Sequence, residues 1–467
     1  MSAPVKTLAR WLLSAGLGLA LLSACSSLPV LVPDLAPQRG TPVPIAGARG
    51  PLSPAQSKAV LARLKRGGSE PTDIFSRHLA LEESLTGSPL TAGNNVTLLQ
   101  NGPNTYRAMI DAIMGARDHV NMETYILEDD EVGRRFVEAL LAKRREGVQI
   151  DLIHDSVGTL HTPKAFFQRL KDAGIEVLEF NPVNPLRAHG DWELNQRDHR
   201  KLLVVDGKVA FLGGINISSV YSGGSFGRGS RAPSHEDDPR WRDTDIEVRG
   251  PVVADFQKLF MQTWAAQHGP PLPQRQWYPA LHSVGNEVVR AIGSSPDDPY
   301  SQIYVTLLSA IGAAESSVHL TNAYFVPDPQ LLTALKDAAR RGVDVTLILP
   351  SKSDSWLVFS AGRSYYTDLL EAGVKIYERR GVILHSKTAL IDGVWSTIGS
   401  TNLDWRSFLH NQEINAVVLG AEFGTQVQAM FDRDLKQSTA ITLEQWKRRT
   451  VDLRLKEWFG RLWEYWL

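Results

Sequence analysis

The chain carries one pattern of apolar and polar positions twice, once in each half of its length. Between residues 112 and 125, apolar positions with helical spacing are followed by a β-prone run, and the same pair recurs between residues 310 and 324. Two further helix–glycine–strand sets follow in each copy, with the glycines at Gly147, Gly174, Gly342 and Gly373. The pattern therefore predicts a duplicated α/β domain.

The repeat is about 190 residues long, whereas the units of solenoid proteins are roughly 20–45 residues long. Each copy closes with a strand, a turn at Gly250 or Gly420, and a helix. We expect an α/β fold of two similar sandwich domains, residues 91–265 and 285–440, joined by a proline-rich linker at 266–284. Pseudo-two-fold symmetry would place equivalent loops opposite one another, so we expect one shared active site.

Composition is consistent with this organisation. A chain of 467 residues is too long for one ordinary core, and 43% hydrophobic with 22% charged residues is typical of globular proteins. The net charge of −1 gives no sign of a polyanionic partner, so we expect no nucleic-acid binding. A single cysteine excludes an intramolecular disulfide and a cysteine-rich zinc site.

The first residues have the form of a processing signal. Lys6 and Arg10 precede an apolar stretch from residue 11 to 22 that is too short to span a bilayer comfortably. Leu22-Ser23-Ala24-Cys25 resembles the bacterial lipobox, which implies a signal peptide at residues 1–24 and a diacylglyceryl group on Cys25. The alternative is an uncleaved helical anchor with an incidental cysteine.

This resemblance implies a location. The mature protein would be lipid-anchored in a bacterial membrane, facing the periplasm, and Ser26 after the cysteine points to the outer membrane. Residues 25–90 are expected to form a tether and N-terminal extension, because the stretch from Leu28 to about Pro54 is rich in proline, glycine and small residues.

Each copy also contains a His-x-Lys-x4-Asp motif, with an asparagine 17 residues after the histidine. The members are His199, Lys201, Asp206 and Asn216 in the first copy, and His385, Lys387, Asp392 and Asn402 in the second. The residues between histidine and aspartate are apolar or β-branched, as in a strand, so histidine and lysine at i and i+2 project from one face. One motif alone would be read as a charged strand edge, but two at equivalent positions of a repeat favour catalysis.

The motifs resemble those of the phospholipase D superfamily, from about Asn95 to Leu435. Residues 198–207 with 213–216, and residues 399–408 with 411–413, are similar to bacterial cardiolipin synthases in particular. The resemblance implies phospholipid substrates, association with a membrane, and transfer of a phosphatidyl group through a phosphohistidine to a hydroxyl of phosphatidylglycerol. It requires no metal and no other cofactor.

The chemistry of a phosphodiester agrees with this resemblance. A neutral imidazole can attack phosphorus while a second imidazole protonates the leaving alkoxide. We assign His199 as the nucleophile and His385 as the acid and base. Lysine and asparagine side chains would hold the non-bridging oxygens, namely those of Lys201, Lys387, Asn216 and Asn402.

A histidine nucleophile needs its other ring nitrogen held in place. Counting back seven residues from the paired glycine turns reaches Asp243 and Glu413, which are the candidates for orienting His199 and His385. The pattern groups Asp243 with the first motif and Glu413 with the second. The alternative is that both are surface carboxylates on a terminal strand.

Asp206 and Asp392 belong to the motif by which the superfamily is named, and so count among the candidate catalytic residues. Their position at the far end of the strand nevertheless favours a structural role over contact with phosphate. His154, Asp155 and His161 match no common set of metal ligands, and we expect no metal site there.

Two remaining segments leave alternatives open. The glycine- and charge-rich stretch from Ser222 to Asp238 predicts a loop, with a lid or acceptor-selecting role as a hypothesis. The C-terminal segment, residues 441–467, predicts an amphipathic helix whose apolar stripe is formed by Val451, Leu455, Trp458, Phe459, Leu462 and Trp466. Such a stripe more often packs in a core, and an interfacial membrane helix is the second interpretation.

Three classes of function fit the motifs. The first is the phosphatidyltransferase described above, and the second is a hydrolase of the same superfamily, either a phospholipase D or a nuclease. The near-neutral charge argues against a nuclease. A non-catalytic lipoprotein that binds phospholipid would need degenerate motifs, and both motifs are intact. The lipid donor, the acceptor and the oligomeric state are not readable from the sequence.

Overall fold

The computed structural model describes residues 43–65, 74–79, 87–184, 193–222 and 241–467. The expected signal peptide, Cys25 and nearly all of the expected loop from Ser222 to Asp238 lie outside the described residues. Residues 36–467 belong to one compact unit.

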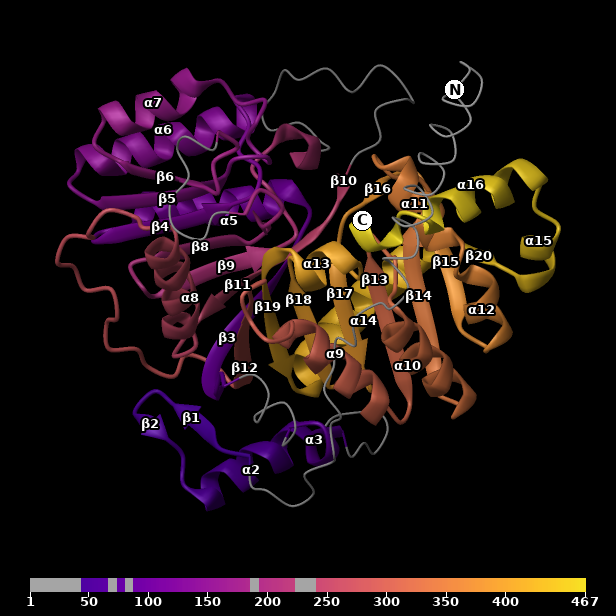
Figure 1. The fold of residues 1–467 in the computed structure, drawn as a ribbon. Coiled ribbons are helices and arrows are strands. Elements are labelled where there is room, and N and C mark those ends of the chain that lie inside the picture. Colours follow the sequence, from indigo (N-terminus) through magenta and orange to yellow (C-terminus); the bar gives the residue numbers. More distant parts are fainter. Residues whose placement is uncertain (1–42, 66–73, 80–86, 185–192, 223–240) are drawn as a thin grey trace, which may run out of the picture. The chain divides into compact units, whose positions relative to one another are not determined.

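The first half of this unit is a mixed sheet with the strand order β3-β11-β9-β8-β4-β5-β6 (Figure 1). The strands are β3 (Leu90–Gln100), β4 (His119–Thr124), β5 (Gln149–Asp155), β6 (Glu176–Phe180), β8 (Lys201–Val205), β9 (Val209–Gly213) and β11 (Thr244–Arg249). Neighbouring strands within the group β4, β5 and β6 are parallel, and the other pairs are antiparallel.

The second half repeats this order as β12-β19-β18-β17-β13-β14-β15, with β20 added at the edge. Its strands are β12 (Glu287–Ser294), β13 (Ser317–Asn322), β14 (Asp344–Pro350), β15 (Lys375–Arg379), β17 (Lys387–Ile391), β18 (Trp395–Gly399), β19 (Asn411–Leu419) and β20 (Ser438–Ile441). The matching order confirms the predicted duplicated α/β fold, and α8 and β12 are separated by an irregular segment that coincides with the expected linker.

Helices cover both faces of the sheets. In the first half they are α5 (Gly102–Gly115), α6 (Glu131–Arg145), α7 (Lys164–Asp172) and α8 (Val253–Ala266). In the second half they are α9 (Gln302–Ala313), α10 (Pro329–Arg340), α11 (Trp356–Arg363), α12 (Tyr366–Glu371), α13 (Trp405–Leu409) and α14 (Ala421–Lys436).

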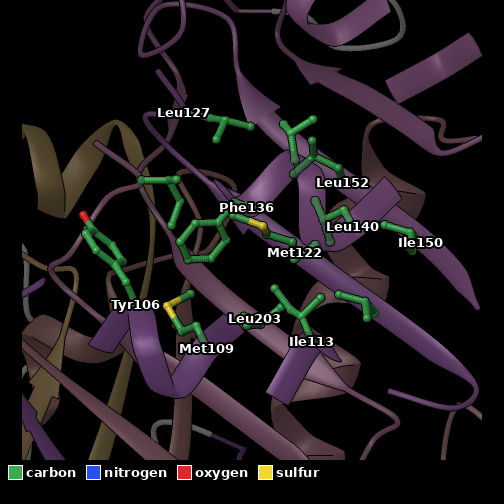
Figure 2. Close-up of a cluster of buried hydrophobic side chains, with 14 of the residues drawn as sticks. Tyr106, Met109, Ile113, Met122, Leu127, Phe136, Leu140, Ile150, Leu152 and Leu203 are labelled. Carbon is green, nitrogen blue, oxygen red and sulfur yellow. The ribbon is translucent and has the colours of Figure 1, made fainter. Parts of the chain in front are cut away.

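One core lies between α5, α6 and α7 and one face of the first sheet. Tyr106, Met109 and Ile113 recur at helical spacing on α5 and are buried against strand residues such as Met122 and Leu203 (Figure 2). The opposite face of the same strands is also covered, by α8. The central strands β8 and β9 are therefore almost entirely apolar, apart from Lys201 at the start of β8, as expected for strands buried on both faces.

A second core joins the two halves. Phe256 and Phe260 of α8 and Val427 and Met430 of α14 belong to one buried cluster with strand residues of both sheets. The sheets are also continuous, because β3 pairs antiparallel with β12. The halves therefore share a core as well as a sheet edge, and their equivalent strands are held in fixed positions.

Two short strand pairs cross between the halves. β7 (Arg197–Asp198), just before the first motif, pairs with the start of β19. β10 (Trp241–Arg242) pairs in the equivalent way with β16 (Ile383–Leu384), just before the second motif. Each motif histidine therefore lies beside a strand of the other half.

The expected tether is ordered where the structure describes it. β1 (Ile45–Gly47) pairs in parallel with the start of β3, and Ile45 is completely buried. β2 (Gly50–Pro51) and α2 (Pro54–Lys65) follow, and α3 (Ile74–Arg77) precedes β3. The tether interpretation is therefore wrong for residues 43–54, because an apolar residue among the prolines and glycines joins the sheet.

The C-terminal segment forms two short helices, α15 (Leu443–Lys447) and α16 (Val451–Arg461), and a 3-10 turn, η3 (Glu464–Trp466), instead of one helix. The expectation that its apolar stripe packs in a core is wrong. Residues Val451, Leu455 and Trp458 are exposed, and α16 packs against the protein through Glu457 and Gly460.

Candidate active site

The two motif histidines immediately precede equivalent strands, His199 before β8 and His385 before β17. Their backbones are anchored to the opposite half in the same way. The His199 N–H donates to the carbonyl of Gln412 at 3.0 Å, and the His385 N–H donates to that of Arg242 at 2.8 Å. Both side chains are nearly buried, with 8% and 5% exposure.

Each histidine contacts the carboxylate that the sequence pattern had grouped with the other motif. His199 Nδ1 lies 3.0 Å from Glu413 Oε1, and His385 Nδ1 lies 2.6 Å from Asp243 Oδ2. Both carboxylates are completely buried. The grouping of Asp243 with the first motif and Glu413 with the second was therefore wrong. The crossed strand pairs β7–β19 and β10–β16 exchange the partners.

A carboxylate only accepts hydrogen bonds when ionised, so these contacts assign the proton to Nδ1 of each imidazole. Because the proton on His385 Nδ1 is directed to Asp243, this nitrogen accepts no hydrogen bond from Lys387 Nζ, which lies 3.0 Å away. The Nε2 atom of each ring is left with its lone pair when the imidazole is neutral. That atom is the one able to attack phosphorus or to carry a proton to an alkoxide.

Further polar groups hold the carboxylates. Ser400 Oγ donates to Glu413 Oε2, and Asn411 Nδ2 donates to Glu413 Oε1 at 3.3 Å. Asp243 Oδ1 accepts from the N–H of Thr244 at 2.7 Å. The orientation of each imidazole is therefore fixed by a buried network, as catalytic and ligating histidines require.

The motif lysines lie beside the histidines. Lys201 Nζ donates to the carbonyl of His199 at 2.6 Å, and Lys387 Nζ donates to the carbonyl of His385. Both are almost completely buried. Two buried lysines next to two imidazoles form the electrostatic setting that an anionic phosphoryl group needs.

Burial dominates the protonation of this cluster. It lowers the pKa of His199 and of His385 from 6.5 to about 4, although their carboxylates act in the opposite direction. Burial also lowers the pKa of Lys201 to about 7 and that of Lys387 to about 8. At neutral pH both histidines are therefore uncharged, as a nucleophile must be.

Glu413 shows the balance of these effects. Burial acts to raise its pKa, but the neighbouring His199 and Lys201 outweigh it, so the pKa lies below its usual value. The carboxylate stays ionised and available to hold the imidazole.

The two asparagines of the pattern reach the same site. Asn216 Oδ1 accepts from the N–H of Ile126 at 3.1 Å, and its amide donates to the hydroxyl of Tyr221 at 2.8 Å. Asn402 Oδ1 is buried with no hydrogen-bond partner in the described part of the chain. An unpaired buried amide oxygen is costly unless a ligand satisfies it.

Asp206 and Asp392 do not belong with the catalytic residues. Asp206 Oδ1 accepts from the N–H groups of Asp118 at 2.8 Å and His119 at 3.0 Å, where β4 begins. Asp392 Oδ1 accepts in the equivalent way from Ser316 at 2.8 Å and Ser317 at 3.0 Å, where β13 begins. Their inclusion in the catalytic set is therefore wrong. They tie the end of each motif strand to the strand beside it.

A cavity of about 330 Å³ brings the two half-sites together. His199, His385, Asn216 and Asn402 all line it, which confirms the geometry of one shared site. Its wall also contains aromatic and charged residues that the sequence did not single out, namely Tyr125, Arg197, Tyr221, Trp241, Tyr324, Asp404 and Arg406.

The two tyrosines of this wall are equivalent in the repeat. The Tyr125 ring meets that of His199 edge to face at 5.1 Å, and the Tyr324 ring meets that of His385 at 6.0 Å. Lys201 Nζ also lies over the Tyr125 ring, 5.2 Å from its centre. The signal was present in the sequence, because Tyr125 and Tyr324 occupy matching positions after equivalent strands.

The sequence of this chain is similar to a known protein family in both halves. A family model described as "Cardiolipin synthase, PLD-like domain" matches residues 109–222 and 307–435, one segment in each half. The cardiolipin synthases of Geobacillus sp. strain WCH70 and Halalkalibacterium halodurans are 35% and 36% identical, over 82% of this chain and 74% of each relative. The chain belongs to the cardiolipin synthase family of PLD-like proteins.

A solved structure with a similar fold is the phosphatidylserine synthase of Haemophilus influenzae Rd KW20. It matches 82% of this chain and 98% of its own with a TM-score of 0.58, at 11% identity. That likeness supports the fold alone.

Two further features bear on how this family member operates. Among the described residues, no group of three or more His, Cys, Asp or Glu side chains is arranged to hold a metal ion. The ring of His154 stacks on that of Phe167, with ring centres 3.9 Å apart. No helix within the described ranges is both long and apolar enough to cross a membrane.

Proposed function

We propose that the protein is a phosphatidyltransferase of the cardiolipin synthase type, which moves a phosphatidyl group through a phosphohistidine to a hydroxyl of phosphatidylglycerol. The observation that carries the proposal is the pair of imidazoles of His199 and His385, each held at Nδ1 by a buried carboxylate and both lining one cavity. Membership of the cardiolipin synthase family selects phospholipids among the possible phosphodiesters.

In the first step Nε2 of His199 attacks the phosphorus of the donor lipid. A P–N bond forms, the P–O bond to the head-group alcohol breaks, and His385 gives its Nε2 proton to the departing oxygen. The Nζ atoms of Lys201 and Lys387 and the Nδ2 amides of Asn216 and Asn402 donate to the non-bridging oxygens. With phosphatidylglycerol as donor, the released alcohol is glycerol.

In the second step the hydroxyl of another phosphatidylglycerol enters the place that the alcohol has left. His385 removes its proton, the oxygen attacks phosphorus, and the P–N bond to His199 breaks. The two steps convert two phosphatidylglycerol molecules into one cardiolipin and one glycerol, and both histidines return to their starting states.

The lowered pKa of His385 sets a condition on the first step, because an uncharged imidazole has no proton at Nε2 to give. An anionic phosphodiester beside the ring favours the charged form and raises the pKa of the histidine. Binding of the substrate therefore favours protonation of His385 at Nε2, so the site takes up a proton together with the phosphate.

The decisive experiment follows the fate of the phosphatidyl group. Purified protein and labelled phosphatidylglycerol should yield labelled cardiolipin in excess of phosphatidic acid, and His199→Ala or His385→Ala should abolish both products. Phosphatidic acid as the dominant product would show a hydrolase of the same superfamily. Full activity of the two variants would exclude the mechanism.

The order of the two histidines needs its own test. The variant His385→Ala should retain the labelled phosphatidyl group covalently when the donor has a leaving group that needs no proton, such as p-nitrophenol, because the nucleophile is present and the base for the second step is missing. His199→Ala should retain none. The opposite result would exchange the two roles.

We also propose that the mature chain is anchored through a lipid on Cys25 and works at the periplasmic side of a bacterial membrane. The lipobox-like stretch that ends at Cys25 supports this location. Metabolic labelling with radioactive palmitate should mark the wild-type chain, and Cys25→Ser should lose the label. Equal labelling of the two proteins would contradict the anchor.

A further inference from the structure

The C-terminal helix α16 turns its apolar side away from the protein. Val451 is 70% exposed, Leu455 60%, Trp458 61% and Leu462 53%. With 3.6 residues per turn these positions form one stripe. The residues of α16 that are buried, Glu457 and Gly460, lie on the other side of the helix.

The contacts of the buried side hold α16 in this orientation. A Cβ atom on Gly460 would lie 2.6 Å from the backbone nitrogen of Ala361 in α11, so only glycine allows the two helices to approach so closely. Glu457 forms a nearly buried ion pair with Arg449 at 2.8 Å. The helix is therefore fastened through its small and charged residues, and the apolar stripe faces outward.

Aromatic residues extend the stripe in both directions. Trp356 at the start of α11 is 59% exposed and stacks on Phe459, with ring centres 6.1 Å apart. Figure 1 shows α16 beside α11. The exposed group, here called the apolar ridge, consists of Trp356, Val451, Leu455, Trp458, Phe459, Leu462, Trp463 and Trp466. Contiguous apolar surface of this kind marks an interaction site in a stable protein.

The ridge borders the mouth of the active-site cavity. Trp466 belongs to the ridge and lines the cavity, and Ser355, next to Trp356, also lines it. A volume of about 330 Å³ is at the low end of the roughly 300–1,000 Å³ typical of small-molecule pockets. The cavity therefore has room for polar head groups, and the acyl chains of a phospholipid must stay outside.

The charge around the ridge is suited to a lipid surface. Residues 443–467 contain six Lys and Arg against four Asp and Glu, while the whole chain has a net charge of −1. Tryptophan prefers the boundary between head groups and acyl chains, and basic residues beside an apolar helix face attract anionic lipids. Lys456 is exposed on α16 itself.

We propose that the apolar ridge docks on the surface of a phospholipid bilayer and sets the mouth of the cavity against the head groups. The identity of the lipid that enters the cavity rests on the proposed function, whereas the docking is a separate property of the ridge. In this arrangement a lipid offers its phosphate to the histidines while its chains remain in the bilayer.

Vesicle binding tests the docking. The chain from Ser26 onward, which lacks the apolar leader and the site of the proposed anchor, should bind vesicles of phosphatidylcholine and phosphatidylglycerol. Adding Leu455→Ser with Trp458→Ser should weaken that binding at least about tenfold, because two large apolar side chains no longer enter the lipid. The matched control, Tyr278→Ser with Val284→Ser, changes two residues of similar exposure, 54% and 53%, in the linker and should bind normally.

A fluorescent label reports the contact directly. In the chain from Ser26 onward, which has no cysteine of its own, a polarity-sensitive dye on Leu455→Cys should shift to the blue when vesicles are added, and the same dye on Asp337→Cys in α10 should not shift. Equal vesicle binding by the ridge variant and the control, or no shift at position 455, would overturn the proposal. So would a ridge that mainly joins two copies of the chain, seen as a dimer in sedimentation that the ridge variant dissociates.

Activity separates failure of docking from failure of the proposed function. The ridge variant should lose activity on vesicles at least about tenfold and keep it on monomeric dihexanoyl phosphatidylglycerol, because only the vesicle reaction needs docking. Equal losses on both substrates would show that the ridge acts on the catalytic site. Ridge-dependent binding by a protein that transfers no phosphatidyl group would leave docking intact and exclude the proposed function alone.

Discussion

Glu413 holds the imidazole of His199 at 3.0 Å although the two residues are 214 positions apart and belong to different halves of the chain. His385 has the same relationship with Asp243 at 2.6 Å. Each half thus supplies the histidine of one pair and the carboxylate of the other. Neither catalytic pair exists within a single half.

The crossed pairs predict opposite defects for two similar substitutions. Glu413→Gln should slow formation of the phosphohistidine, because an amide no longer fixes the His199 tautomer. With a donor whose leaving group needs no proton, Asp243→Asn should slow only its breakdown, which depends on His385 as the base. Each should reduce turnover on the order of 10²-fold. Trapping with labelled lipid should leave the covalent intermediate on Asp243→Asn and little on Glu413→Gln.

A matched control is Glu422→Gln, which changes an exposed carboxylate of α14 and should leave turnover unchanged. Accumulation of the intermediate on Glu413→Gln in place of Asp243→Asn would mean that the nucleophile and the acid are reversed. Near-normal turnover of both variants would show that neither carboxylate serves catalysis.

The lysines predict a fall of kcat/KM on the alkaline side. Their pKa values of about 7 for Lys201 and about 8 for Lys387 mean that the phosphate site loses positive charge as the pH rises through that range. The histidines, with a pKa of about 4, stay neutral well below pH 6. Because the first step also needs a proton on His385, which the free enzyme lacks above pH 4, kcat/KM on monomeric short-chain lipid should peak near pH 4, fall about tenfold per pH unit above it, and fall more steeply once the pH passes 7 to 8.

The variant Lys387→Arg provides the comparison, because guanidinium keeps its charge throughout this range. Its alkaline limb should reflect Lys201 alone. An acid limb between pH 6 and 7, with no alkaline decline below pH 9, would contradict the assignment of these charges.

Stability should also depend on pH through the two histidines. Their folded pKa of about 4 lies below the ordinary 6.5, so between those values the unfolded chain binds protons that the native protein does not. The contribution of the neutral imidazoles is complete above pH 6.5 and is lost as the pH falls toward 4. Thermal midpoints measured from pH 7 to pH 4.5 should fall.

The double variant His199→Gln with His385→Gln should show a shallower fall over the same range. His282→Gln, which changes an exposed histidine of the linker, should behave like the wild type. Identical slopes for the double variant and the wild type would remove the histidines as the source of the dependence.

The strand-end aspartates should contribute to stability and not to chemistry. Asp206→Ala leaves the backbone N–H groups of Asp118 and His119 without their acceptor, which should cost about 1–3 kcal/mol in urea unfolding. Activity per folded molecule should stay within about twofold, because the Asp206 carboxylate binds the start of β4 and does not line the cavity. A loss like that of His199→Ala in a stably folded protein would restore Asp206 to the catalytic set.

Much of this architecture follows from the sequence because the pattern is duplicated. The alternation between His199 and Asp206 predicts a strand, and its recurrence before Asp392 indicates two equivalent strands, which the structure confirms as β8 and β17. Counting back from Gly250 and Gly420 also located the two carboxylates.

The exchange of carboxylates between the two halves could not be predicted from the sequence. It depends on β7 and β10, which are two residues long and too short to produce any periodic signal. The spacing between Asp243 and Gly250 does not indicate whether the Asp243 side chain faces the histidine of its own half or that of the other half. The partner of each histidine is set by tertiary packing.

The C-terminal stripe was predicted from periodicity, which records that a helix is amphipathic and not which side faces the protein. The residues that decide which side of α16 packs against the protein lie opposite the apolar stripe. Gly460 permits a close helix contact and Glu457 has a partner in Arg449, so that side is able to pack.

The last residue of the sequence has a practical consequence for anyone who prepares the protein. The carbonyl of Leu467 accepts from the N–H of Arg406 at 2.9 Å, and both residues line the active-site cavity. A purification tag or fluorescent protein fused after Leu467 would leave the chain at the cavity mouth, beside the apolar ridge. Placing such a fusion in an exposed loop far from this edge avoids obstructing the entrance that lipids would use.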